Sequence, residues 1–61
     1  MNNLEAYRIR AGFSQSELAR NSGVYQPKIS RAERNVKDLF GLEWLALAKA
    51  LDCTVDELLG R

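Results

Sequence analysis

Apolar residues at the start of the chain recur at the spacing of an amphipathic helix. Leu4, Tyr7, Arg8 and Ala11 lie at i, i+3, i+4 and i+7, and this stripe predicts a first helix that ends at Gly12. Arg8 is the charged member of the stripe, and a guanidinium on a buried face needs a carboxylate partner.

Two environments for Arg8 remain open. Glu33, at the end of a later predicted helix, is the candidate partner in a buried ion pair. Alternatively, Arg8 lies at the edge of the stripe and its charged end extends into solvent.

A capping signal predicts where the second helix begins. The Ser14 hydroxyl can accept a hydrogen bond from the Glu17 amide, and the Glu17 carboxylate can accept one from the Ser14 amide. The helix should therefore begin at Gln15 and run to about Asn21 or Ser22, where Gly23 ends it in a left-handed conformation.

Residues 15–34 have the pattern of two short helices that cross through a tight turn. Ala19 is small enough for the helices to approach closely, and Gly23 can turn sharply because it has no Cβ. An inward-facing apolar set accompanies them: Leu18, Val24, Ile29 and Ala32. This arrangement is a helix-turn-helix, whose second helix would enter the DNA major groove.

Pro27 limits where that second helix can start. Proline is tolerated in a first turn and biases the residue before it toward extended backbone, so Gln26 lies at or next to the N-cap. The helix is expected to end near Arg34, and Asn35 is the residue best suited to a left-handed stop.

Two further helices are predicted in the last third of the chain. A broad apolar face defines the fourth: Leu42, Trp44, Leu45, Leu47, Ala48 and Leu51. A second capping box at 54–57 opens the fifth, with Val55, Leu58 and Leu59 facing inward. Five short helices and no strand pattern predict a compact all-α domain over residues 1–61.

Length and composition narrow the function. A domain of 61 residues buries only about 60% of the surface that its unfolded chain exposes, which leaves little room for an enzyme cleft. With one cysteine and no histidine, the sequence offers no disulfide, Cys/His metal cluster or His-activated nucleophile. Cys53 is expected to be a small buried side chain rather than a reactive thiol.

No cofactor, small-molecule substrate or membrane partner is therefore expected. The longest apolar run has five residues, and the start of the chain lacks the features of a signal peptide, so a cytoplasmic location is expected.

The two parts of the chain carry opposite net charges. Residues 1–37 hold seven basic and three acidic side chains, a net charge of +4; residues 38–61 hold two basic and five acidic, a net charge of −3. This division favours a basic half that faces DNA and an acidic outer half. The alternative is ordinary scatter of solvated charge.

The chain resembles the lambda-repressor and Cro-like (Xre-type) helix-turn-helix family over most of its length. The resemblance rests on three pieces in order: LEAYRIRAGFSQSELARNSGV, KISRAER and LALAKALDCTVDELL. It implies a five-helix domain that regulates transcription, typically by binding a palindromic operator in double-stranded DNA as a homodimer.

The resemblance also implies roles for individual residues. Gln15 corresponds to a phosphate-contacting glutamine, although a solvated surface position is the simpler alternative. Gln26 and Lys28 fall where first-turn side chains reach base edges, and Arg31 lies one turn further along that face. Arg8 and Glu33 fall on a buried ion pair of the family.

The chemistry of these side chains suggests how DNA would be read. Arg31 could pair with guanine, Gln26 with adenine, and the Pro27 ring could pack on a thymine methyl. The alternative for Arg31 is a solvated or phosphate-bound arginine. A second group is expected to contact phosphates, which fixes register without reading sequence: Gln15, Tyr25, Lys28, Arg34 and Lys37.

Two questions stay open at this point. The dimer surface could include Trp44 and 39–40, although burial of Trp44 in the core is the alternative. The same fold could instead serve as an antitoxin-like or regulatory module that binds another protein. A steep loss of DNA affinity between about 50 and 200 mM salt would separate DNA binding from that module.

Overall fold

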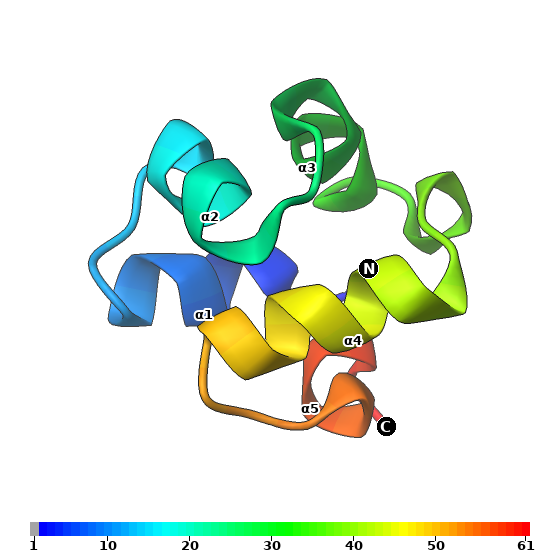
Figure 1. Cartoon of the computed structure of the whole chain (residues 1–61). Helices are drawn as coiled ribbons and strands as arrows, with labels where there is room; N and C mark the ends of the chain where they lie inside the picture. The colour runs from blue at the N-terminus through cyan, green and yellow to red at the C-terminus, as the bar shows by residue number, and fades with distance from the viewer. Residues whose placement is uncertain (1) are drawn as a thin grey trace.

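The helices predicted from the sequence are all present in the computed structural model, which describes residues 2–61, so that only Met1 of the expected domain lies outside it (Figure 1). The order is α1 (Leu4–Arg10), α2 (Gln15–Ser22), α3 (Gln26–Ala32), a short 3₁₀ helix η1 (Val36–Asp38), α4 (Gly41–Ala50) and α5 (Val55–Leu59). Within residues 2–61 no strand forms, and the predicted all-α class is confirmed.

Reciprocal hydrogen bonds fix the starts of α2 and α5. Ser14 Oγ accepts from the Glu17 amide at 3.0 Å, and Glu17 Oε1 accepts from the Ser14 amide at 2.8 Å. Thr54 and Glu57 repeat this arrangement at 3.0 and 2.9 Å. Both predicted capping boxes are confirmed, and each satisfies two amides that a helix start would otherwise leave unpaired.

One apolar core joins the helices. Its buried residues come from α1 to α5 and the connections between them: Leu4, Leu18, Val24, Ile29, Ala32, Leu39, Trp44, Leu47, Ala48, Leu51 and Leu58. The inward set predicted for α2 and α3 is confirmed. Trp44 is 4% exposed and belongs to this core.

The broad apolar face predicted for α4 is wrong at two positions. Leu42 is 81% exposed and Leu45 is 44% exposed. A three-residue repeat drifts around a helix that has 3.6 residues per turn, so these two leucines leave the face that Trp44, Leu47 and Ala48 bury.

Of the two left-handed helix stops predicted from the sequence, the one at Gly23 is present and the one at Asn35 is not. Gly23 has φ +77° and its amide donates to the Ala19 carbonyl at 2.8 Å. The left-handed stop predicted at Asn35 is wrong, because Asn35 is extended at φ −148° and its Oδ1 accepts from the Lys37 amide. Asn35 therefore caps η1 instead of ending α3.

A left-handed turn without glycine joins α4 to α5. Asp52 has φ +54°, a region that aspartate tolerates better than most residues. Cys53, which follows it, is partly buried, and this burial raises the pKa of its thiol.

The segment before α1 ties distant helices together. Asn2 Nδ2 donates to the Ala32 carbonyl at the end of α3, and the Asn3 amide donates to the Leu58 carbonyl in α5, both at 2.7 Å. The first residues of the described chain thus hold α3 and α5 in fixed relation to α1. Among residues 2–61, the helices are all too short to cross a membrane.

Candidate nucleic-acid interface

Helices α2 and α3 pack together and place the start of α3 at the surface. Figure 1 shows α3 at one side of the molecule with α2 beside it, and α5 at the opposite side. Ile29 and Ala32 bury the inner face of α3, while Arg31 on its outer face is exposed. The first turn and outer face of α3 therefore form the surface that a groove in DNA could receive.

Four polar side chains form a continuous row from α1 to the start of α3. Arg8 Nε donates to Glu33 Oε2 at 2.6 Å, and Gln15 Nε2 donates to Glu33 Oε1 at 2.9 Å. Gln26 Nε2 then donates to Gln15 Oε1 at 3.0 Å. The row links a largely buried charge to a side chain in the first turn of α3.

Arg8 adopts the first of the two environments considered for it, a buried ion pair with Glu33. The Arg8 side chain is 12% exposed and the Glu33 side chain 6% exposed. Arg8 Nη1 also donates to the Phe13 carbonyl at 2.9 Å, so most of the guanidinium is satisfied within the protein. The hydrogen bond to Glu33 raises the pKa of Arg8 above its ordinary value.

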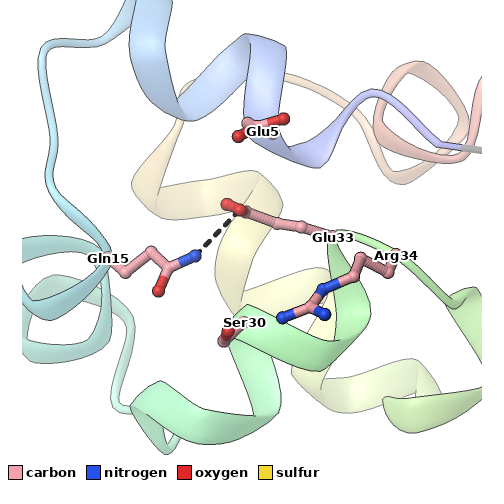
Figure 2. Close-up of a pocket in the computed structure, with 5 residues that line it drawn as sticks. All are labelled: Glu5, Gln15, Ser30, Glu33 and Arg34. Carbon is pink, nitrogen blue, oxygen red and sulfur yellow. Dashed lines mark hydrogen bonds between the residues drawn. The ribbon is translucent and has the colours of Figure 1, made fainter.

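Glu33 sets the direction of every hydrogen bond in the row. A carboxylate only accepts, so Gln15 must turn its NH₂ group toward Glu33, as Figure 2 shows. The carbonyl oxygen of Gln15 is then turned toward Gln26. Gln26 in turn must donate to that oxygen. Gln26 is left with one N–H and its carbonyl oxygen, neither of which has a partner among residues 2–61.

A surface hollow adjoins this row. Five residues line it: Glu5, Gln15, Ser30, Glu33 and Arg34. Figure 2 shows Gln15 and Glu33 reaching toward each other across it, with Ser30 and Arg34 from the α3 side. The hollow is lined by negatively charged, positively charged and uncharged polar side chains.

The remaining predicted contact residues surround the start and the end of α3. Tyr25 is the N-cap residue and is 69% exposed; its side chain makes no capping bond. Pro27 is partly buried in the first turn. Three cations are exposed and make no ion pair within residues 2–61: Arg31, Arg34 and Lys37.

Lys28 is engaged with a residue that the sequence analysis did not single out. Its Nζ lies 3.0 Å from Glu43 Oε2, and 5.5 Å from the centre of the Phe40 ring. Glu43 Oε1 also accepts from the Phe40 amide at 3.0 Å, at the start of α4. A glutamate at the third position of a helix is one half of a capping box, and Glu43 could have been recognised by it. The other half is a serine or threonine at the N-cap, and here the N-cap is Phe40, which has no side-chain oxygen.

These hydrogen bonds determine the ionisation of Glu43. The bond from the Phe40 amide, followed by the bond from Lys28, lowers the pKa of the Glu43 carboxyl. Glu43 is therefore an anion at neutral pH, close to the first turn of α3.

The sequence model of a family described as helix-turn-helix matches residues 4–58. The chain belongs to this helix-turn-helix family. The match extends from α1 into α5 and agrees with the lambda-repressor-like resemblance. No curated protein and no solved structure matches the chain.

Membership gives the helix-turn-helix domain a general function. It is a DNA-binding regulatory protein, of a family that is not typically enzymatic. The row of side chains from Arg8 to Gln26 links α1, the start of α2 and both ends of α3. The site therefore combines a hydrogen-bonded internal support with a partly exposed first turn of α3.

Proposed function

We propose that residues 1–61 act as one domain that represses transcription by binding a palindromic operator in double-stranded DNA as a homodimer. The observation that carries the proposal is the fixed orientation of Gln26, because a side chain held in one direction can discriminate among bases. A phage or bacterial regulator of this kind would act in the cytoplasm.

Gln26 has the pair of groups that recognises adenine. Its second N–H and its carbonyl oxygen, which have no partner within residues 2–61, match the N7 acceptor and N6 donor that adenine presents in the major groove. Arg31, one turn further along the exposed face of α3, has the fork of donors that fits guanine O6 and N7. Pro27 lies between them in sequence and offers an apolar ring to a thymine methyl.

Phosphate contacts would fix the position of the domain without reading bases. Gln15 keeps one N–H that the row does not use, and Tyr25, the residue before α3, is 69% exposed. The group proposed to contact phosphates is Gln15, Tyr25, Arg34 and Lys37. Lys28, which the sequence also placed in this group, is left out because its ammonium group is already paired with Glu43.

A substitution at Arg31 tests whether this side chain recognises a base in the major groove. Sites should first be selected from a random pool of duplex DNA, and binding of Arg31→Ala should then be measured on the selected site and on its single-base variants. Loss of about 1–3 kcal/mol of discrimination at one G·C pair supports base reading. Equal weakening on every sequence would reduce Arg31 to a phosphate contact.

A second copy of the chain is proposed to cover the exposed apolar side chains of the α4 region. Phe40 is 75% exposed, Leu42 81% and Leu45 44%, and the two leucines lie three residues apart on α4. The domain measures 24 × 20 × 18 Å between its outermost Cα atoms. Two adjacent copies are therefore compatible with half-sites about 34–36 Å apart.

Sedimentation tests the dimer. Self-association at micromolar concentration, weakened by Leu42→Ser, supports this face. A monomer with and without the selected DNA would exclude the homodimer. Absence of binding to any DNA pool at low salt would exclude the repressor and favour a module that binds another protein.

A further inference from the structure

Among residues 2–61, the ion pair between Lys28 and Glu43 sets an anion against one of the predicted DNA-contacting residues of α3. Lys28 is in the first turn of α3, two residues after Gln26. Its Nζ is 3.0 Å from Glu43 Oε2, and the two side chains are 32% and 23% exposed. The pair is therefore partly shielded from solvent and stronger than an open surface pair.

Two further contacts hold this pair in place. Glu43 cannot easily follow Lys28 away from α4, because its other oxygen accepts from the Phe40 amide. The Phe40 ring also faces the ammonium group, with 5.5 Å between Nζ and the ring centre. Lys28 is thus drawn toward the start of α4 and away from solvent.

A DNA phosphate would have to compete with Glu43 for the same ammonium group. Each lysine or arginine that neutralises a phosphate releases a counterion, so the number of such contacts sets the slope of affinity against salt concentration. A lysine that stays paired with a carboxylate adds nothing to that slope.

We propose that Glu43 is a positioning residue that withholds Lys28 from the DNA backbone and so limits the charge-driven part of DNA affinity. This inference rests on the proposed DNA-binding function. It assigns Glu43 a role although Glu43 itself touches no base or phosphate in the proposed complex.

The test compares the salt dependence of binding among variants. Fluorescence anisotropy with a labelled duplex of about 20 base pairs and mixed sequence gives affinity between about 50 and 200 mM salt. Glu43→Gln should bind about two- to fivefold more tightly at the lowest salt, and its slope should be steeper by about 0.9. Adding Lys28→Gln to this variant should remove both effects.

Glu57→Gln is the matched control. Glu57 occupies the same capping position in α5, so the substitution changes the net charge and the cap in the same way, on the side of the molecule away from α3 (Figure 1). Its salt slope should equal that of the original chain. Thermal melts of each variant show that the compared proteins are folded.

The outcomes separate the two proposals. If Glu43→Gln and Glu57→Gln have the same slope, Glu43 does not withhold Lys28, while the DNA-binding function stands. The single variant Lys28→Gln provides a second test that leaves both glutamates intact: a shallower slope than the original chain means that Lys28 already contacts phosphate, which overturns the inference. If neither the original chain nor Glu43→Gln binds DNA at low salt, both proposals fail.

Discussion

Replacing Glu33 with alanine tests the most buried charge interaction of the domain. The substitution leaves the Arg8 guanidinium without its carboxylate, in a position where the Arg8 side chain is only 12% exposed. Removing one partner of a buried ion pair costs about 3–5 kcal/mol. We expect the lower end of that range, about 3 kcal/mol, because Arg8 keeps its bond to the Phe13 carbonyl and lies 3.8 Å from Glu5.

This loss is large for a chain of 61 residues. Typical stabilities per residue imply a total of roughly 3–9 kcal/mol, so Glu33→Ala should remove between about a third and all of the free energy of unfolding. For a domain of this size, the midpoint of thermal unfolding should fall by about 12–24 °C. Circular dichroism during heating and urea titration measures both quantities.

Glu5→Ala is the control for charge at Arg8. Glu5 is also paired with Arg8, but its side chain is 63% exposed, so its removal should cost less than about 0.5 kcal/mol. The joint replacement of Arg8 by Met and Glu33 by Leu should cost far less than Glu33→Ala, because neither charge is left unpaired. Equal losses for Glu33→Ala and Glu5→Ala would refute the reasoning, since they would mean that Arg8 is well solvated.

Two further predictions concern the backbone and pH. Gly23→Ala should destabilise the domain by about 1–2 kcal/mol in urea titration, because φ is +77° although no atom lies within 4 Å of the added Cβ; an unchanged midpoint would contradict this. Capping hydrogen bonds lower the pKa values of Glu17, Glu43 and Glu57, so their stabilisation is complete above about pH 4.5 and is lost as the pH falls through the lowered values. Melting temperatures should therefore decline below that pH, and a rise on acidification would contradict the assignment.

The sequence was most informative where structure depends on neighbouring residues. The Ser14 and Thr54 caps and the turn at Gly23 involve residues within a few positions of one another, so their patterns could be read directly. The pairing of Arg8 with Glu33 spans 25 residues, yet it followed from a simple requirement that a buried cation has a carboxylate.

The incorrect and missing predictions depend on how distant segments pack. Leu42 and Leu45 are as apolar as Leu47. Their three-residue repeat drifts around the helix, and the packing of α4 against the other helices decides at which end of the repeat the leucines leave the core. Asn35 had the chemistry for a left-handed stop, but it caps the 3₁₀ helix that follows. Glu43 was overlooked because its partner Lys28 belongs to another helix.

The hydrogen-bonded row from Arg8 to Gln26 constrains how the base preference of this domain could be re-engineered. Gln26 and Gln15 share one hydrogen bond whose direction Glu33 determines. Replacing Gln26 alone with a residue that only accepts would turn two oxygens toward each other. A library that aims at new target sequences should therefore vary positions 15 and 26 together and keep Glu33 fixed.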